Sequence, residues 1–426
     1  MKVLVIGSGG REHAIACSLS KSSLVDRLFW TPGNAGTVGL ADNPGLAVDD
    51  LEGLLNFAKR EKVELTVVGP EGPLAGGIAD LFFDQGLRIF GPVSAGARIE
   101  GSKIFAKRLM EKSGIPTSDF AEFHDMSSAR NYIKSIDPPY VIKADGLAAG
   151  KGVIIAHTAD EAKKALSSMF EKKIFGDSGT KIVVEDFLEG EEATVLALCD
   201  GKNVLPLISS QDHKPVFDGD KGPNTGGMGA IAPAPAVSRT VMDRVMDRVL
   251  VPLVNEFNAG GIDYKGVIYA GLMICEGNPF VVEFNCRFGD PEAEAVLPLL
   301  ESDLCEVILQ TVNGELKNRV LKWRDGYSCD VVLVSGGYPG KYEKGKKINI
   351  PETQHDDIVV FHSGTKMKDN VPVTNGGRVL NIVGFGKTLT GAVERAYRHV
   401  KSINFENMFY RKDIGQRGLR TQKKST

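Results

Sequence analysis

Three polar side chains alternate with apolar ones in the first half of one stretch, Val281–Glu294, whose sequence is VVEFNCRFGDPEAE. Because successive side chains of a strand point to opposite faces, Glu283, Asn285 and Arg287 can share one face. A carboxylate and an amide oxygen suit a hard cation such as Mg²⁺, which usually keeps phosphate and water oxygens as its other ligands. A guanidinium adds bidentate recognition of a carboxylate or phosphate. The stretch therefore predicts a phosphoryl-transfer site, and a buried strand end with a satisfied polar cluster is the alternative.

The residues after this strand predict a turn into a helix. Gly289 allows the turn, Asp290 is a typical N-cap residue, and Pro291 suits the first helical position. The polar strand end is therefore expected to pass directly into a helix capped by Asp290.

Three glycine-rich loops, at 7–12, 32–36 and 69–73, follow short apolar strands. Strands and helices alternate here, which predicts a parallel α/β unit with these loops at the strand C-terminal ends. The first loop half-matches the dinucleotide fingerprint, but Glu12 replaces its third glycine and Thr31 replaces the acid that would hold a ribose, so NAD is disfavoured. A phosphate at the helix N-terminus stays open, as do plain tight turns.

Another glycine loop lies at Lys143–Gly152, with the sequence KADGLAAGKG. Its backbone N–H groups and two lysines could meet a polyphosphate, and a hairpin with solvated lysines is the alternative. The loop lacks the order of a P-loop and precedes a strand, so it is not one. Lys103 gives a weaker signal of the same kind, because a cation in the first turn of a helix opposes the helix dipole unless an anion is bound. Ser102 beside it could simply be a cap.

Two further segments could contact a ligand. Residues 185–192, EDFLEGEE, resemble an acidic hinge that could offer an apolar slot to a base and a carboxylate to a ribose, with an acidic surface turn as the alternative. Residues 211–229 form a long stretch without periodicity, rich in charge and glycine. Because long loops inside compact domains tend to be functional or disordered, we expect this stretch to contact substrate.

The elements that position these residues predict an α/β and α+β multidomain protein. Residues 1–101 are expected to form an N-terminal parallel α/β domain. Residues 102–320 are expected to form a second domain, within which residues 117–190 make a compact mobile unit. Residues 321–426 are expected to form a separate C-terminal α+β domain with antiparallel strands.

Local patterns add three expectations. Helices are predicted near 75–85 and over 239–258, and a hairpin is predicted around Gly277-Asn278. The segment after Tyr410 is basic, and its last residues are expected to be solvated and poorly packed.

Composition limits the class of protein. The chain has 426 residues, a hydrophobic share of 42% and a formal charge of −3, so it can build several cores and gives no argument for a nucleic-acid partner. Its six cysteines include no C-x-x-C pair, which indicates reduced thiols in a cytoplasmic protein. No apolar run approaches the length of a membrane span and the N-terminus does not resemble a signal peptide, so no membrane partner is expected.

A set of short motifs together resembles one family. The order of α/β unit, lysine-bearing hinged unit, acidic hinge and strand E-F-N-x-R resembles the ATP-grasp superfamily, and more closely the phosphoribosylamine–glycine ligases, also called glycinamide ribonucleotide synthetases. Asp413-Ile414-Gly415 resembles the family's ending, so the resemblance is nearly full length. The other matching motifs are GSGGREHA (7–14), PGNAG (32–36), GPExPL (69–74), GSK (101–103), KADGLAAGKG (143–152), QDHK (211–214), GPNTGGMG (222–229) and NxRFGDPE (285–292).

The resemblance implies an N-terminal pre-ATP-grasp domain, a two-part ATP-grasp fold with a lid, and a C-terminal cap domain. It implies that ATP phosphorylates the glycine carboxylate to an acyl phosphate, which the amine of 5-phosphoribosylamine attacks to give glycinamide ribonucleotide in de novo purine synthesis. ATP and Mg²⁺ or Mn²⁺ are the implied cofactors. A monomer is expected, and a dimer is left open.

The resemblance also implies roles for individual residues. Glu283 and Asn285 would hold the metal, and Arg287, Lys143 and Asp212 would be catalytic. ATP would be bound by Lys103, Lys143, Gly146, Gly150, Lys151, Glu185, Leu188 and Glu192. The substrates would meet Gly9, Asn34, Gly36, Glu71, Asp212, Asn224, Thr225 and Arg287.

Two departures from the family pattern matter. Residues 270–274, AGLMI, carry no second metal-binding acid, which weakens the expectation of a second metal, and Pro215 stands where relatives often have arginine. Another ATP-grasp ligase, a carboxylase subunit and a nucleotide-binding regulatory protein are the alternatives. The QDHK and GPNTGGMG loops argue against the other enzymes, and the retained polar residues argue against a protein that has lost catalysis.

Overall fold

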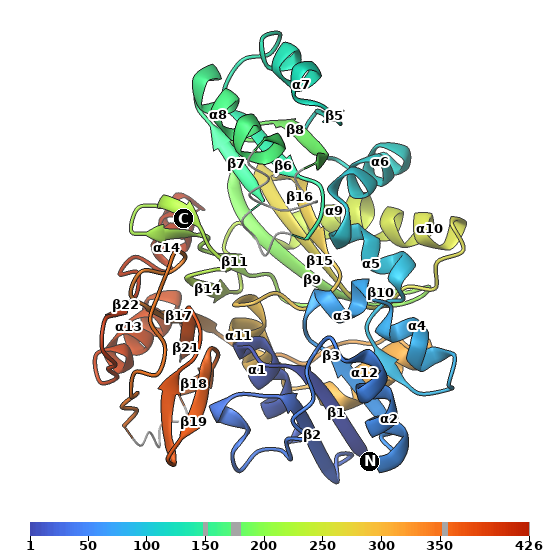
Figure 1. Cartoon of the computed structure of the whole chain (residues 1–426), viewed down its shortest axis with the longest axis vertical. Coiled ribbons are helices and arrows are strands. Elements are labelled where there is room, and N and C mark those ends of the chain that lie inside the picture. Colours follow the sequence, from blue (N-terminus) through green and yellow to red (C-terminus); the bar gives the residue numbers. More distant parts are fainter. Residues whose placement is uncertain (148–151, 172–179, 352–356, 426) are drawn as a thin grey trace.

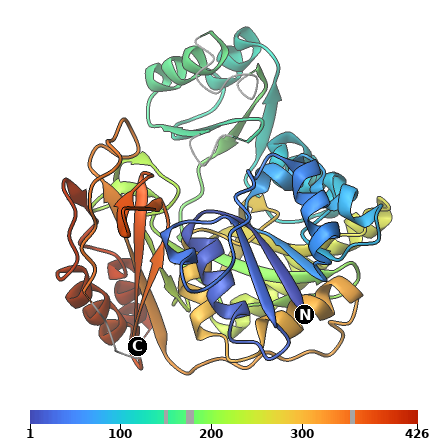
Figure 2. The same ribbon diagram turned by 60° about the horizontal axis from the view of Figure 1, so that its bottom comes forward.

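The computed structural model describes residues 1–147, 152–171, 180–351 and 357–425. In Figure 1 a small unit with α7 and α8 stands above the rest, the N-terminal sheet lies below it, and the C-terminal sheet with α13 lies beside them. Figure 2 shows the same separation of the small unit from another side. None of the helices in these residues is long and apolar enough to cross a membrane.

The N-terminal sheet is parallel throughout, as its alternating pattern predicts. β1 (Lys2–Gly7) pairs with β2 (Arg27–Pro32) and β3 (Leu65–Val68), and β3 pairs with β4 (Ile89–Phe90). The strand order β2-β1-β3-β4 brings the three glycine loops to one edge. The other elements here are α1 (Gly10–Leu19), η1 (Ala35–Thr37), α2 (Leu51–Glu61), α3 (Glu71–Ala75), α4 (Ile78–Phe83) and α5 (Ser94–Gly101).

The helix predicted near 75–85 is interrupted. α3 ends at Ala75 and α4 begins at Ile78. Gly77 lies between them with φ +85, a left-handed conformation that glycine adopts readily, so it separates the two helices. Glu71 therefore begins a short helix of its own instead of lying in a loop.

The small unit has its own sheet and core. Its strands follow the order β5-β8-β6-β7 and are antiparallel, and α7 and α8 pack on them around buried residues such as Ile142 and Leu166. The preceding helix α6 (Lys103–Ser113) connects it to the N-terminal domain. The elements are β5 (Phe120–Phe123), α7 (Met126–Ile133), β6 (Tyr140–Ala144), β7 (Val153–Ala156), α8 (Ala159–Phe170) and β8 (Ile182–Asp186).

The central sheet positions the polar strand end. Its order is β10-β9-β15-β16, with all pairs antiparallel. β15 (Lys265–Cys275) and β16 (Asn278–Asn285) form the predicted hairpin. The remaining elements of this region are β9 (Glu191–Asp200), β10 (Val204–Pro206), α11 (Glu292–Val296), η4 (Leu297–Leu299) and α12 (Leu304–Asn313).

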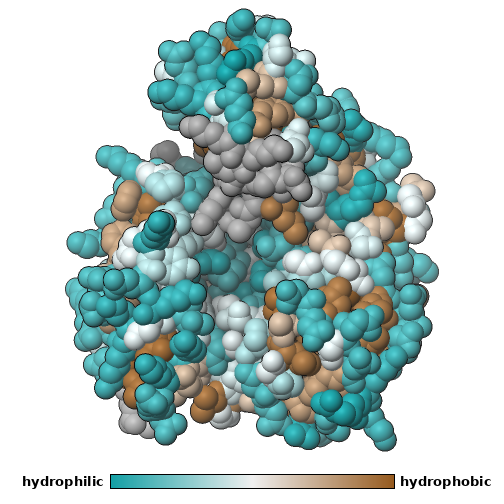
Figure 3. Space-filling model, viewed as in Figure 1, coloured by the Kyte–Doolittle hydropathy of each residue, from teal (hydrophilic) through white to brown (hydrophobic). Residues whose placement is uncertain are grey.

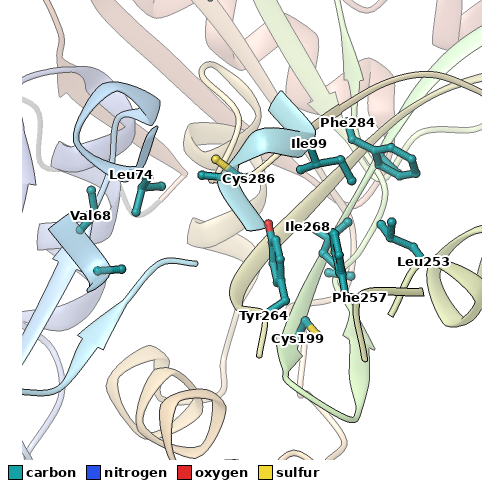
Figure 4. Close-up of a cluster of buried hydrophobic side chains, with 14 of the residues drawn as sticks. Val68, Leu74, Ile99, Cys199, Leu253, Phe257, Tyr264, Ile268, Phe284 and Cys286 are labelled. Atoms are coloured by element: carbon teal, nitrogen blue, oxygen red, sulfur yellow. The ribbon is translucent and has the colours of Figure 1, made fainter. Parts of the chain in front are cut away.

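A long helix covers one face of the central sheet, and the two share an apolar core. Phe257 stacks on Tyr264 with ring centroids 4.7 Å apart, next to Ile268 and Leu253 (Figure 4). The helix predicted over 239–258 is present but irregular. It consists of α9 (Arg239–Val245), a π-helical turn (Met246–Leu250) and α10 (Val251–Ala259). The adjacent Pro252 has no N–H to donate, so a change in the hydrogen-bond ladder at this point has a local cause.

The C-terminal sheet includes strands from residues 211–229, which the sequence predicts to be an irregular loop. β14 (Gly229–Ala232) pairs with β11 (Gln211–Asp212) and with β17 (Tyr327–Ser335), giving the order β11-β14-β17-β21-β18. The prediction is wrong because such short strands carry too few residues to show a period. The sheet contains strands from both sides of the boundary predicted at residue 320. The domain boundaries remain predictions. The other elements are β12 (Pro215–Phe217), β13 (Lys221–Asn224), β18 (Ile358–His362), β19 (Thr365–Lys368), β20 (Val371–Thr374), β21 (Arg378–Gly386), α13 (Leu389–Val400), β22 (Met408–Phe409) and α14 (Gln416–Ser425).

The start of the basic segment after Tyr410 packs against the rest of the protein. The guanidinium of Arg411 is buried, lies 2.8 Å from Asp413 and 3.0 Å from Asp220, and donates to the Pro215 carbonyl at 2.9 Å. Composition cannot reveal this, because an arginine can be buried once its charge is paired and its donors are satisfied.

Candidate active site

A cavity of about 820 Å³ lies between the small unit, the central sheet and the C-terminal sheet. Figure 3 shows a hollow with hydrophilic walls at the centre of the molecule. Gly150 and Lys151, both predicted to bind ATP, lie outside the described residues. The cavity is lined by most of the other predicted site residues, namely Glu71, Lys103, Lys143, Gly146, Glu185, Leu188, Glu192, Asp212, Asn224, Thr225, Glu283, Asn285 and Arg287.

Two lysines share one buried carboxylate at the end of the cavity nearest the small unit. Lys143 at the end of β6 lies 2.8 Å from Glu185 Oε1, and Lys107 of α6 lies 2.8 Å from Glu185 Oε2. Burial opposes the charged form of Glu185, but Lys143 and then Lys107 hold the pKa of this carboxyl below its usual value. Burial lowers the pKa of Lys107 to about 8. The cluster carries more cations than anions.

Lys103 lies at the N-terminus of α6 and lines the same end of the cavity. Its Nζ donates to the Gly146 carbonyl at 3.1 Å, which ties α6 to the start of the glycine loop. Asp145 Oδ1 accepts from Ser102 Oγ at 2.9 Å and from the Ile104 N–H at 3.1 Å. Asp145 therefore supplies a negative charge at this helix N-terminus, so the first-turn lysine does not by itself require an anionic ligand.

Apolar side chains line the cavity beside the acidic hinge. Leu147, Ile155 and Phe187 are 39%, 42% and 37% exposed, and Leu188 lies with them on the wall. Partly exposed apolar side chains around a cavity fit a ligand with a flat apolar face, such as a base. The geometry therefore agrees with the apolar slot predicted at residues 185–192.

Glu283 and Asn285 project from β16 into the cavity, as the period of the strand predicts. Lys214 Nζ donates to Glu283 Oε1 at 3.0 Å. This lysine lowers the pKa of Glu283 to about 2, so the carboxylate is ionised at any working pH. Among the described residues no group of three or more His, Cys, Asp or Glu side chains could hold a metal alone. A cation here would need further oxygen ligands from phosphate or water.

Arg287 is held between two carboxylates. Its Nη2 lies 2.8 Å from Glu100 Oε1 on α5, and its Nε lies 3.3 Å from Glu71 Oε2 on α3. Burial opposes the charge of Arg287, but Glu100 and then Glu71 raise its pKa above the usual value. Burial raises the pKa of Glu100, and Arg287 opposes that shift. This cluster has more carboxylates than cations, the reverse of the lysine cluster.

Asp212 lies on β11 close to Glu292 at the start of α11. Within the described residues, its Oδ1 is buried and has no hydrogen-bond partner. Burial and then the charge of Glu292 raise the pKa of Asp212 well above its usual value. Glu292 Oε1 accepts from the Tyr269 hydroxyl at 2.7 Å. Asp212 is therefore poised to gain or lose a proton within the cavity.

The turn after β16 differs from the prediction. Asp290 does not cap the following helix, whose N-cap position is held by Pro291 without a side-chain hydrogen bond. Instead Asp290 Oδ1 pairs with Arg378 of β21 at 3.0 Å. The prediction is wrong because a distant cation attracts the carboxylate away from the helix end.

Three predicted substrate residues in the N-terminal loops do not line the cavity. The N–H of Gly9 donates to Glu12 Oε2 at 2.6 Å, so the chain's own carboxylate takes the place expected for a phosphate. Asn34 Nδ2 donates to the Ser8 and His362 carbonyls at 2.9 and 2.7 Å. Gly36 lies so close to the His13 ring that a Cβ would clash with it. These residues hold loops together in this structure.

Several residues in the walls of the cavity are not among the predicted site residues. Lys107 had a usable signal, because it lies four residues after Lys103 on one helix face. Lys214 had one too, as part of the QDHK motif. Glu100, Arg378 and Arg417 had none, since only the fold brings them to the cavity.

The family of the chain follows from comparison with known proteins. Models of the phosphoribosylglycinamide synthetase family match residues 1–100 as the N domain, 101–293 as the ATP-grasp (A) domain and 328–417 as the C domain. A phosphoribosylamine–glycine ligase of Vibrio vulnificus (strain CMCP6) is 47% identical over 423 residues, which are 98% of this chain and 99% of the relative.

Solved structures give the same result. The crystal structure of a phosphoribosylamine–glycine ligase from Thermotoga maritima matches with a TM-score of 0.84 and 35% identity, over 97% of this chain and 100% of that one. A biotin carboxylase domain from Hydrogenobacter thermophilus has a TM-score of 0.75 but only 17% identity, over 99% of this chain and 98% of that one, so it shares the fold alone. The chain therefore belongs to the phosphoribosylglycinamide synthetase family, whose ATP-grasp domain carries the cavity's lysines, Glu283 and Asn285 of β16, and Arg287 just after that strand.

Proposed function

We propose that this chain is an ATP-dependent ligase that joins glycine to 5-phosphoribosylamine, giving glycinamide ribonucleotide, ADP and phosphate in de novo purine synthesis. Its family and its relatives support this activity. The observation that carries the proposal is a cavity with a cation-rich end and a carboxylate-rich end, with Glu283 and Asn285 of β16 and the following Arg287 in its lining.

The cation-rich end is the proposed nucleotide site. Lys103 and Lys143 would hold phosphate oxygens of ATP, and the apolar wall with Leu188 would receive the adenine. Glu192 at the start of β9 lines the cavity beyond this wall and would accept hydrogen bonds from the ribose. Glu185 forms ion pairs with both Lys107 and Lys143, so we assign it the role of holding these lysines in place.

The donor set at Glu283 and Asn285 fits a divalent cation. Both donors are oxygens, and Glu283 stays ionised because of its low pKa. When bound, the metal would neutralise charge on the phosphates during transfer. The family uses ATP and a divalent metal, and we propose Mg²⁺ with Mn²⁺ as the alternative. Lys214 would hold the Glu283 carboxylate toward the cavity.

The carboxylate-rich end is the proposed site of the two amine-bearing substrates. Glu71 and Glu100, which both pair with Arg287, could attract ammonium groups, while Arg287 would face the oxygens of the carboxylate or phosphoryl group. Asn224 and Thr225 form the opposite wall. Thr225 Oγ1 donates to the Lys214 carbonyl at 2.8 Å and accepts from the Gly227 N–H at 2.9 Å, which fixes the shape of this loop.

The chemistry requires positioning more than a covalent side chain. A carboxylate and an amine do not condense at a useful rate, so the glycine carboxylate must first receive the phosphoryl group of ATP. The amine of phosphoribosylamine then attacks the acyl carbon, and phosphate leaves. Lysines and Arg287 would stabilise the moving negative charge. Asp212, with its raised pKa, would accept the proton that the amine loses. Closure of residues 117–190 would exclude water, which otherwise hydrolyses the acyl phosphate.

The direct test is ADP release by the purified chain with ATP, Mg²⁺, glycine and phosphoribosylamine, each omitted in turn. We expect sustained release only with the complete mixture, together with formation of glycinamide ribonucleotide. Release that depends on bicarbonate instead of glycine would indicate a carboxylase. Nucleotide binding without turnover would indicate a regulatory protein.

Two aspects of the setting stay predictions. The six cysteines are all free in the structure, and a reducing, cytoplasmic environment stays a prediction. A monomer is still the predicted assembly, and size-exclusion chromatography with light scattering would test it.

A further inference from the structure

We infer that Arg417, on the C-terminal helix α14, positions the Glu192 carboxylate for the ribose hydroxyls of ATP and thereby helps the enzyme to select ribonucleotides. This inference rests on the proposed function, in which Glu192 meets the ribose. Arg417 is then a positioning residue in the C-terminal domain that acts on the nucleotide site of the ATP-grasp domain.

The contacts place Arg417 directly behind Glu192. Arg417 Nη1 donates to Glu192 Oε2 at 3.2 Å, and both side chains line the cavity. The Glu192 side chain keeps 38% of its surface exposed and lines the cavity, so Arg417 does not cover it fully. On its other side Arg417 pairs with Asp220, with Nε 3.2 Å from Oδ2 and Nη2 3.3 Å from Oδ1. Arg417 therefore bridges the nucleotide site and the loop between β12 and β13.

The position of Arg417 is not explained by the needs of its own helix. It is the second residue of α14, where a cation opposes the helix dipole. Asp220 compensates this charge, and Arg411 in turn pairs with Asp220 at 3.0 Å. A helix that only needed to be stable would have an acidic or neutral residue here. The ion pair with Glu192 accounts for the presence of an arginine at the N-terminal end of α14.

Helix α14 is docked firmly enough to set the position of a side chain. His213 Nε2 accepts from the Gly415 N–H at 3.2 Å just before the helix. Burial, and then the charges of Arg417 and Arg411, lower the pKa of His213 to about 3, so this acceptor stays neutral at working pH. Within the first turn of the helix, Gly418 packs so closely on Ile231 of β14 that a Cβ would clash (Figure 1 shows α14 beside this sheet).

A fixed carboxylate can tell ribose from deoxyribose. One carboxylate oxygen held by Arg417 leaves the other oxygen in a set orientation to accept from the ribose hydroxyls. Without Arg417 the Glu192 side chain loses its ion-pair partner and gains rotamer freedom. Each hydrogen bond from Glu192 to a ribose hydroxyl then costs more side-chain conformational entropy. A site built to bond a hydroxyl discriminates strongly against the analogue that lacks it, so the loss should appear as reduced discrimination.

The test compares ATP with 2′-deoxy-ATP in the wild type, Arg417→Met and Arg417→Lys, with glycine and phosphoribosylamine saturating. We expect the wild type to prefer ATP in kcat/KM by about tenfold, which corresponds to about 1.4 kcal/mol. Arg417→Met should raise KM for ATP by a similar factor with little change in kcat, and should reduce the preference to within about twofold, because the hydroxyl contact loses its charged support. Arg417→Lys should recover part of the preference.

Arg420→Met is the matched control, because Arg420 is exposed on the same helix and does not line the cavity. It should retain wild-type kinetics. Binding of ATP and 2′-deoxy-ATP measured by calorimetry gives a readout without turnover and should show the same loss of preference in Arg417→Met.

The possible outcomes separate this inference from the proposed function. Wild-type turnover with an unchanged nucleotide preference in Arg417→Met would overturn the inference alone. A wild type without any preference for the ribonucleotide would overturn it too, as would an equal rise in KM for all three substrates. Absence of glycine-dependent turnover in the wild type would instead overturn the proposed function, while the calorimetric comparison would still decide whether Arg417 acts on the ribose site.

Discussion

The two ends of the cavity use the same kinds of charged residue in opposite proportions. At one end Lys107 and Lys143 share the single carboxylate of Glu185. At the other end the single guanidinium of Arg287 is shared by Glu71 and Glu100. The first cluster has cations in excess and the second has carboxylates in excess.

The difference indicates how one cavity can sort its ligands. An excess of lysine suits a polyphosphate, and flexible ammonium groups can follow oxygens that move during transfer. An excess of carboxylate suits the ammonium and amine groups of glycine and phosphoribosylamine, while the rigid fork of Arg287 fixes the orientation of the group being transferred. Charge ratio, more than residue type, then separates the nucleotide end from the acceptor end.

The largest effect is expected from removing a cation at the nucleotide end. Lys143→Met should lower kcat/KM for ATP by about 100-fold, or about 2.7 kcal/mol, because Glu185 would keep only Lys107 and a phosphate contact would be lost. Lys163→Met is the control, since Lys163 is an exposed lysine on α8 of the same unit. If Lys143→Met lowered kcat/KM for glycine more than kcat/KM for ATP, the assignment of the lysine-rich end of the cavity to ATP would be wrong.

Removing the charge of Glu283, between the two ends of the cavity, should have the next largest effect. Glu283→Gln should lower activity at least about tenfold, a loss of about 1.4 kcal/mol of transition-state stabilisation, while thermal unfolding shows that the fold survives. Glu276→Gln, at the exposed tip of the same hairpin, should be unaffected. Near-normal turnover of Glu283→Gln at saturating Mg²⁺ would remove Glu283 from the metal site.

A smaller and more selective effect is expected at the acceptor end. Glu71→Ala should raise KM for phosphoribosylamine by about fivefold and KM for ATP by less than about twofold, because a ground-state contact to one substrate affects that substrate alone. Steady-state kinetics with each substrate varied in turn would measure this. Equal changes for both substrates would mean that Glu71 supports Arg287 without contacting the acceptor.

The smallest effect is expected from pH. Asp212 has a raised pKa because it is buried and close to Glu292, so it loses its negative charge as pH falls through that raised value. Glu283, with a pKa of about 2, keeps its charge over the same range. We therefore expect the acid limb of kcat/KM to lie at higher pH for phosphoribosylamine than for ATP. The residual activity of Asp212→Asn should lack that higher limb, and identical limbs in both enzymes would contradict a proton-accepting Asp212.

The sequence predicted those parts of the molecule whose signals are local. The parallel order of β1, β2 and β3 followed from alternation along the chain, and the shared face of Glu283 and Asn285 followed from the period of β16, whereas Arg287 lies beyond the end of that strand and still lines the cavity. The motifs then identified the family. These features depend on neighbours in sequence, so they can be read without coordinates.

What the sequence did not predict depends on contacts between distant segments. Asn34 matched a ligand-loop pattern, but the backbone of His362 takes one of its donors. Asp290 matched a helix cap, but Arg378 lies beside it. Arg417 lay in a segment that composition marked only as basic, yet it lines the cavity. In each case the partner is encoded far away, and no local pattern reveals it.

The sheet shared between β14 and β17 has a consequence for dividing the chain. A fragment of residues 1–320 would leave the edge of β14 without its partner strand and His213 without the Gly415 N–H. Unpaired strand edges promote aggregation, so this fragment is expected to be poorly behaved when produced alone. Supplying residues 321–426 as a separate polypeptide would restore the missing strand and helix. The enzyme is therefore a candidate for fragment complementation, in which two inactive pieces regain activity only when they assemble.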